Sequence, residues 1–219
     1  MSAYNFKTAI IKHFDATVYK SGTFVLNARI FYDIVRKLPN SEILIETNAS
    51  YQANIRCERS KFNIPGTSGD DFNYLPEVEK NKYISLSQFT LKEIIRQTVF
   101  SISDNESNKI MTGELFEISG DTFKVVSLDG HRISLRNIEL KDSYDPIKVV
   151  VPGKTLNEIS KILSGDADKD ISIYFTDKHA LFEFDNTIVL SRLIEGEYYK
   201  INQMLSGDYE TKLTVNRKM

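Results

Sequence analysis

Three stretches of the chain repeat one pattern: FYDIVRKL at 31–38, LKEIIRQT at 91–98 and LNEISKIL at 156–163. Each begins with an apolar residue, any residue, an acid, isoleucine, any residue and a base, and the copies start 60 and 65 residues apart. Apolar side chains recur every three to four residues, which is typical of an amphipathic helix that packs one face on a core. The pattern therefore predicts three helices, each covered on one side and solvated on the other.

A repeat of this length indicates supersecondary units that follow one another along the chain. Short runs of alternating apolar residues surround each helix, so each unit is predicted to have the order β-α-β-β-β. The helices are expected at about 27–38, from Ser87 or Thr90 onward, and at 155–163. The expected fold class is α+β, with helices on one face of antiparallel sheets.

The strands of these units are expected at 6–14, 16–20, 22–26, around Ile43 and Ile45, 51–57, 62–64, 84–86, 109–118, 122–128, 131–140, 149–152, 171–176, 179–185, 187–193 and 211–215. A turn at Gly120-Asp121 is expected to join the strands 109–118 and 122–128. The polar, glycine-containing stretch from Pro65 to Lys82 is expected to be a connector.

Composition limits the class of protein. With 219 residues, 41% hydrophobic and 26% charged, the chain is typical of globular proteins, and no uncharged apolar run approaches the ~18 residues that a spanning helix needs. A cytoplasmic location is therefore expected. The single Cys57 is expected to be a buried strand thiol. A net charge of −2 argues against binding nucleic acid by bulk positive charge, although a local basic surface remains possible.

Several segments carry a family resemblance. They are 27–39, Arg59-Ser60-Lys61-Phe62, Asp129-Gly130-His131-Arg132-Ile133, Val151-Pro152 with the helix that follows, and Leu193-Ile194-Glu195-Gly196. With these segments the whole chain resembles the bacterial sliding clamp, the beta subunit of DNA polymerase III, and Asp-Gly-His-Arg between two strands is fairly specific to that family. The resemblance implies the DNA-clamp fold. It implies that residues 1–80 are the second half of clamp domain 1, 81–206 are domain 2, and 207–219 begin domain 3.

Family members are head-to-tail homodimeric rings around duplex DNA, with helices lining the hole. The bases of the three helices are then expected to face DNA and to contact phosphates weakly, without reading sequence. These DNA-facing residues are Arg29, Arg36, Lys37, Lys92, Arg96, Lys154 and Lys161. The alternative for any one base is a solvated helix face that serves solubility alone.

The resemblance also implies a peptide pocket in domain 2, where the polymerase III catalytic subunit, the clamp loader and repair proteins insert a segment of the Gln-Leu-x-Leu-Phe kind. The pocket is expected to contain Met111, Leu128, Gly130, His131, Arg132, Ile133, Tyr199, Gln203 and Met204. Tyr199 and Gln203 depart from the family, which usually has proline and often arginine there. Because the rest of the wall comes from the family's third domain, this chain is expected to bind such peptides more weakly than an intact clamp.

The subunit interface implied by the resemblance contains Arg59, Lys61, Phe62 and Ile64. In the family this strand pairs with domain 3 of the neighbouring subunit, so an unpaired copy would be an open sheet edge that favours self-association. The alternative places Phe62 and Ile64 simply in the core.

Two other functions remain to be weighed. Asp129 and His131 could belong to a hydrolytic enzyme, although no nucleophile, metal-ligand spacing or phosphate loop accompanies them. A repeat-built scaffold unrelated to DNA is the third possibility. The leading interpretation is a non-catalytic binding protein, with no cofactor or metal and no membrane contact.

Overall fold

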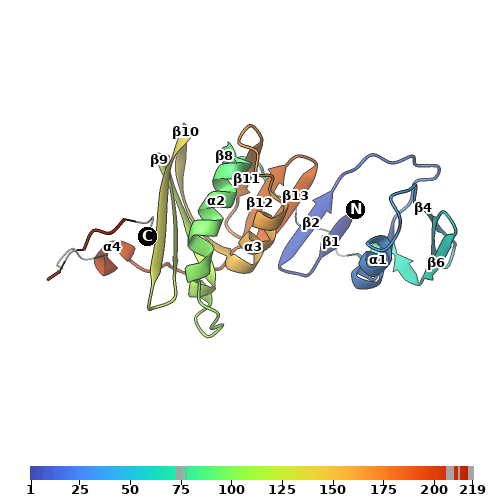
Figure 1. Ribbon diagram of the computed structural model, residues 1–219, viewed down its shortest axis with the longest axis horizontal. Coiled ribbons are helices and arrows are strands. Elements are labelled where there is room, and N and C mark those ends of the chain that lie inside the picture. Colours follow the sequence, from blue (N-terminus) through green and yellow to red (C-terminus); the bar gives the residue numbers. More distant parts are fainter. Residues whose placement is uncertain (73–75, 77, 206–209, 212, 217–219) are drawn as a thin grey trace. The chain divides into compact units, whose positions relative to one another are not determined.

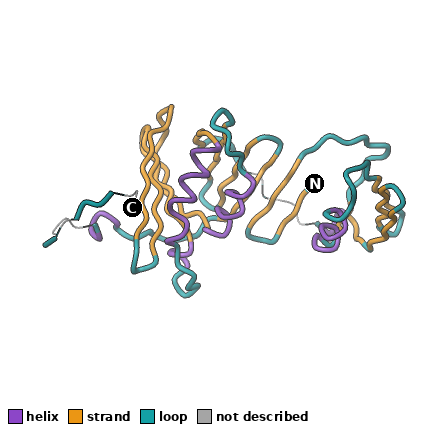
Figure 2. The backbone as a smooth tube through the Cα atoms, in the orientation of Figure 1, coloured by secondary structure: helices purple, strands orange, loops and turns teal. Residues whose placement is uncertain are grey.

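The computed structural model describes residues 1–72, 76, 78–205, 210–211 and 213–216 (Figure 1). It contains short helices and antiparallel sheets, which confirms the predicted α+β class (Figure 2). The chain forms two compact units: residues 1–84 with 171–191, and residues 85–170 with 192–219. In the described part of the chain, no helix is long and apolar enough to cross a membrane.

The first unit contains three sheets. Its strands are β1 (Ser2–Tyr4), β2 (Thr8–Lys12), β3 (Phe24–Leu26), β4 (Leu44–Thr47), β5 (Ala53–Cys57), β6 (Ser60–Ile64), β7 (Gly66–Ser68), β11 (Asp170–Phe175), β12 (His179–Phe184) and β13 (Thr187–Arg192). The strand orders within the three sheets are β4-β5-β6, β3-β7, and β1-β2-β13-β12-β11-β8. Strand β8 (Tyr83–Ser87) begins in this unit and continues into the second. Because β2 pairs with β13, residues far apart in sequence share one sheet.

Helix α1 (Ala28–Val35) begins where the sequence predicts, because the Asn27 side chain accepts a hydrogen bond from the backbone N–H of Ile30. No residue of α1 is fully buried, and its apolar residues Phe31, Ile34 and Val35 remain half-buried. In the same unit, β5 does supply core residues, since Ala53, Ile55 and Cys57 are buried on one face.

The second unit is built on two long strands, β9 (Gly113–Leu128) and β10 (Ile133–Pro152), which pair antiparallel. Glu117 and Lys124 of β9 form a 3.2 Å ion pair, whereas a straight strand would hold them about 23 Å apart. The chain therefore folds back at Gly120-Asp121, as predicted, and Gly120 has the positive φ of 61° that a tight turn needs. Residues 133–139 of β10 then pair with 122–128, and 147–152 pair with 113–118.

Helices α2 (Gln88–Thr98) and α3 (Gly153–Ile162) pack against each other and against β9 and β10 (Figures 1 and 2). Ser87 caps α2 by accepting from the N–H of Thr90, which selects the earlier of the two predicted starts. The buried Gln88 side chain accepts from Ser164 N and donates to the carbonyl of Asp170, which ties the start of α2 to the chain after α3. The two helices therefore run antiparallel.

Some expected strands are absent from the structure. Residues 16–20 lie outside any strand, and Lys109–Thr112 form a 3-10 helix, one of three in the described part of the chain together with Gly69–Asp71 and Val99–Ser101. Of the expected strand 211–215, Thr211 and 213–215 lie outside any strand, and Lys212 lies outside the described residues. Apolar side chains alone do not make these segments strands, because a strand also needs a neighbouring strand to accept its hydrogen bonds.

A carboxyl group lies in the interior of the second unit. Glu114 of β9 is 0% exposed, and neither carboxylate oxygen has a hydrogen-bond partner. Burial raises its pKa to about 8, and the nearby Thr98 hydroxyl, which donates to the carbonyl of Ile94, lowers it by a smaller amount. Glu114 is therefore a neutral acid at pH 7, because the anion would lose its hydration without compensation.

This burial predicts that stability depends on pH. The folded state holds the Glu114 proton until about pH 8, whereas the unfolded state releases it near its ordinary pKa of 4.5. Stability should therefore fall as pH rises from about 4.5 to 8, by about 4 to 5 kcal/mol in total. Glu114→Gln should remove this loss. In urea denaturation, the free energy of unfolding of the variant relative to the wild type should therefore be much more favourable at about pH 8.5 than at about pH 5. Glu117→Gln, on the same strand but partly exposed, is the control. An equal difference between wild type and Glu114→Gln at both pH values would refute the prediction.

Candidate peptide-binding site

An apolar cluster lies on the face of the β9–β10 sheet that points away from α2. Ser127 faces the helix, since its hydroxyl donates to the carbonyl of Thr98 at 2.5 Å. Its neighbours Val126 and Leu128 therefore point to the opposite face. The cluster's buried members are Leu115, Val126, Leu128, Val150, Tyr198 and Ile201, and Ile110, Met111, Ile133 and Ile194 pack partly buried around them.

The segment after β13 crosses this apolar cluster. The N–H of Ile194 donates to the carbonyl of Val150 at 2.9 Å, and the Tyr198 hydroxyl donates to the carbonyl of Val126 at 3.3 Å. Burial of the Tyr198 ring raises the pKa of its hydroxyl, and the nearby Glu114 carboxyl raises it further. The short helix α4 (Ile201–Met204) follows, with Ile201 buried in the cluster.

Exposed groups border the same cluster. Tyr199 is 36% exposed and Met204 48% exposed. The Tyr199 hydroxyl accepts a 2.6 Å hydrogen bond from the side-chain amide of Asn108, which links the segment before α4 to the loop before β9. A proline here could not make this bond, so the departure from the family pattern at Tyr199 adds a polar contact.

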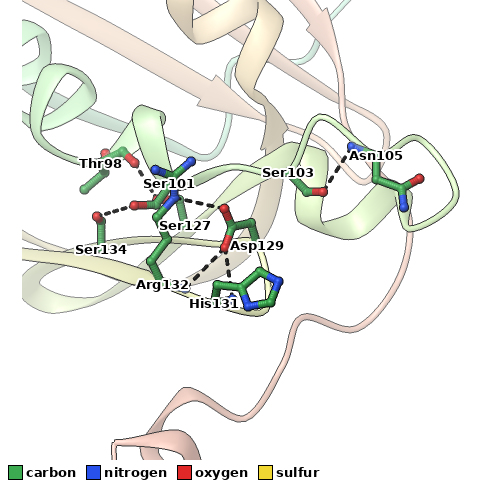
Figure 3. Close-up of polar contacts among 9 residues, drawn as sticks. All are labelled: Thr98, Ser101, Ser103, Asn105, Ser127, Asp129, His131, Arg132 and Ser134. Atoms are coloured by element: carbon green, nitrogen blue, oxygen red, sulfur yellow. Dashed lines mark hydrogen bonds and ion pairs between the residues drawn. The ribbon is translucent and has the colours of Figure 1, made fainter.

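The loop from Asp129 to Arg132 forms one edge of the site (Figure 3). The Asp129 carboxylate accepts from the backbone N–H groups of His131 and Arg132 at 3.0 and 3.2 Å, and from Arg132 Nε at 2.9 Å. The hydrogen bond from His131 N is the main cause of the lowered Asp129 pKa, and those from Arg132 add to it against partial burial. Gly130 supplies a φ of 91°, a conformation that side chains disfavour. The loop is therefore held by its own aspartate.

Two hydroxyl contacts attach these strands to the end of α2 (Figure 3). Besides the bond from Ser127 to Thr98, the hydroxyls of Ser101 and Ser134 lie 2.7 Å apart and share a hydrogen bond. The Arg132 guanidinium lies 6.0 Å from the centre of the exposed Phe100 ring. The rim of the site is thus fixed to the helix layer.

The same geometry disagrees with the hydrolase alternative. Asp129 bonds the backbone N–H of His131, not its imidazole, and its lowered pKa makes it a poor proton carrier near pH 7. In the part of the chain that the structure describes, no three His, Cys, Asp or Glu side chains gather as a metal site.

The structure brings most of the predicted pocket residues to one place. Met111, Leu128 and Ile133 belong to the apolar cluster or pack on it, Gly130, His131 and Arg132 form the loop at its edge, and Tyr199, Gln203 and Met204 lie exposed on the segment around α4. Sequence reasoning missed Tyr198 and Ile201. Their signal was weak, because an apolar residue in an irregular segment has no periodicity to reveal which face it takes.

The predicted DNA-facing bases all lie on or beside the helices, and most already have an acidic or carbonyl partner. The base of the repeated pattern pairs with the acid three residues earlier in every helix: Asp33 with Arg36, Glu93 with Arg96, and Glu158 with Lys161. Lys154 pairs with Glu106, and the Lys92 ammonium donates to the carbonyl of Leu163 at 2.9 Å. Arg29 and Lys37 are exposed. The sequence contains both members of each pair at fixed spacing, but the expected contact with DNA involves only the base.

The predicted interface residues lie on or next to β6. This strand is at the edge of the β4-β5-β6 sheet, with β5 as its neighbour. Ile64 is buried, Phe62 is 37% exposed, and Arg59 and Lys61 are exposed. The core alternative therefore holds for Ile64, and Phe62 retains exposed apolar surface at the edge.

Comparison with known proteins gives this fold a family. The profile of the DNA polymerase III beta subunit, central domain, matches residues 85–200, and that of the N-terminal domain of the same subunit matches residues 2–76. A putative DNA polymerase III beta subunit from Eubacterium rectale is 60% identical, with a TM-score of 0.91 over 95% of this chain and 57% of that one. The sliding clamp from Bacillus subtilis is 31% identical, with a TM-score of 0.88 over 94% and 57% of the two chains.

The class defined by this architecture is the DNA-clamp fold, with helices on one face of antiparallel sheets in repeated units. The chain belongs to the DNA polymerase III beta subunit family, the bacterial sliding clamps. The beta sliding clamps of Staphylococcus epidermidis and Staphylococcus aureus are 37% and 35% identical to it over 199 residues, which are 91% of this chain and 52% of each relative. The chain thus spans about half the length of these relatives.

The loop geometry makes a prediction of its own. Asp129→Ala removes the acceptor for two backbone N–H groups, so the amides of His131 and Arg132 should exchange with deuterium at least about tenfold faster. Asp121→Ala, at the Gly120-Asp121 turn of the same sheet, should leave those amides unchanged. Unaltered exchange in Asp129→Ala would show that the loop is held by other contacts.

Proposed function

We propose that this chain acts as part of a DNA sliding clamp, which encircles duplex DNA and holds partner proteins through a peptide-binding site. The proposed partners are the catalytic subunit of DNA polymerase III, the clamp loader and repair proteins, and the proposed assembly is a homodimeric ring. The proposed role is non-catalytic. Residues 1–80, 81–206 and 207–219 would belong to its successive domains. The two compact units of the structure divide the chain differently, because β2 pairs with β13 and residues 171–191 therefore group with residues 1–84.

The observation that carries this proposal is the apolar cluster around Leu128, bordered by exposed Tyr199 and Met204 and by the fixed loop from Asp129 to Arg132. An apolar centre with a few oriented polar groups at its rim suits the anchor residues of a short peptide. The proposed pocket residues therefore lie where an extended Leu-x-Leu-Phe segment could place its apolar side chains.

Peptide binding tests the proposal. A labelled peptide containing Gln-Leu-x-Leu-Phe should bind the chain in fluorescence polarisation, and Met204→Lys should weaken binding by about tenfold, the equivalent of about 1.4 kcal/mol of lost apolar contact. The 219-residue chain should bind more weakly than a full-length relative, because it offers fewer contacts.

The matched control is Leu213→Lys, which introduces the same charge at a residue that is 82% exposed. It should leave peptide affinity unchanged. Equal effects of the two substitutions would contradict the assignment of the site, and affinity equal to that of a full-length Bacillus subtilis clamp would contradict the expected weakening.

The open edge of β6 leads to a second prediction, on self-association. An edge strand with an exposed apolar residue can pair with a strand of another copy. Light scattering should therefore show a mass that increases with concentration, and Phe62→Lys should reduce it by charging the edge. Phe14→Lys, a change at an exposed residue outside the strands, should not. A single monomer peak at high concentration would refute the proposed pairing.

A further inference from the structure

The acid and the base of the repeated pattern contact each other across one turn in all three helices. The closest atoms are 4.0 Å apart between Arg36 Nε and Asp33 Oδ1, and 2.7 Å apart between Lys161 Nζ and Glu158 Oε1. In α2 the contact is bidentate, with Arg96 Nε and Nη2 donating to the two Glu93 oxygens at 2.9 and 2.7 Å. An arrangement that recurs in three separate copies calls for a common role.

The charges of the helices follow the same rule. Counting the C-cap Arg36 with α1, each helix carries two bases and one acid, which leaves one net positive charge per helix. The acid is Asp33, Glu93 or Glu158, and in every case it lies within reach of the base that would meet a phosphate. In each helix, one of the two bases is therefore paired with the acid, and half of the positive charge is neutralised.

We infer that Asp33, Glu93 and Glu158 limit the affinity of the three helices for the DNA backbone, by competing with phosphate for the base three residues further on. The inference rests on the proposed clamp function. It assigns the acids a role of their own, which is to keep contacts with duplex DNA weak enough for the protein to move along it.

The physical basis is the exchange of partners. A free arginine that binds a phosphate releases the cations condensed on the DNA, which favours binding and makes it depend on salt. An arginine already bound to a carboxylate must first give up that partner, and the freed carboxylate then attracts a cation. Each paired base therefore gains less from meeting DNA than a free base would. These exposed pairs are weak enough to open, so they attenuate contact without preventing it.

The geometry predicts an order among the three acids. Glu93 should compete most strongly, because it makes two hydrogen bonds to Arg96 and accepts a third from the Gln97 amide. Glu158 makes one short hydrogen bond to Lys161, and Asp33 is only at the limit of an ion pair with Arg36. Removing the acids singly should tighten DNA binding in the order Glu93, Glu158, Asp33.

The test compares two triple variants with the wild-type chain. D33N/E93Q/E158Q frees the three bases, whereas E46Q/E117Q/E183Q removes three acids that lie on strands and pair with other bases, namely Arg56, Lys124 and Lys80. Both raise the net charge from −2 to +1. A fluorescent duplex DNA of random sequence is titrated with each protein over a series of low salt concentrations, and melting curves verify that the variants fold.

The helix variant should bind DNA more tightly than the wild-type chain. The slope of its log affinity against log salt concentration should be steeper by up to ~0.9 per freed base, which changes the affinity by about threefold per base over a fourfold range of salt. The strand variant should change the slope much less. Equal slopes for the two variants would overturn the inference, because only bulk charge would then matter, and a helix variant indistinguishable from wild type would overturn it as well.

A third variant separates this inference from the function on which it rests. The variant R36Q/R96Q/K161Q should bind DNA more weakly than the wild-type chain does. If it does so while D33N/E93Q/E158Q has no effect, only the competition by the acids is wrong. If neither the wild-type chain nor any variant binds DNA, or if removal of the bases changes nothing, the proposed contact between these helices and DNA fails, and the inference fails with it.

Discussion

The contact between the apolar faces of α2 and α3 and one face of the folded β9–β10 sheet holds the second unit together. Leu91, Ile94 and Ile95 of α2, and Leu156 and Ile159 of α3, are buried. Because helices occupy one face of the sheet, the charged faces of α2 and α3 are left to solvent on one side. The other sheet face carries the apolar cluster under Tyr198. The two proposed interaction surfaces are therefore the two sides of one layered core.

The sequence predicted the elements in which apolar residues recur at a regular spacing. The helices at Ala28, Gln88 and Gly153 lie within two residues of an expected start, and the Gly120-Asp121 turn was recognised from its residue types. The failures have a different origin. Residues 109–112 were expected to begin a strand, yet they form a 3-10 helix, because a strand exists only where another strand pairs with it. Pairing between β2 and β13 likewise depends on chain segments that sequence patterns treat separately.

The candidate site likewise contains residues that the sequence could predict and contacts that it could not. Met111, Leu128 and the Asp129–Arg132 loop could be placed from a family resemblance, since a short motif identifies them. The contacts that give the site its shape could not. The hydrogen bond between Asn108 and Tyr199 joins residues 91 positions apart, and the complete burial of Glu114 contradicts what an acid in a strand predicts. The ion pairs of the helices were a different omission, because spacing alone was enough to foresee them.

Helix α1 differs from α2 and α3 in a way that bears on how the chain loses its structure. It spans eight residues, and none of them is fully buried. A helix this short has little stability in isolation, so its neighbours must hold it in place, and here they cover it only in part. When the molecule is warmed, the turns of α1 should therefore fray well before α2 and α3 separate from their sheet. Proteases would cut there while the rest of the chain remained native.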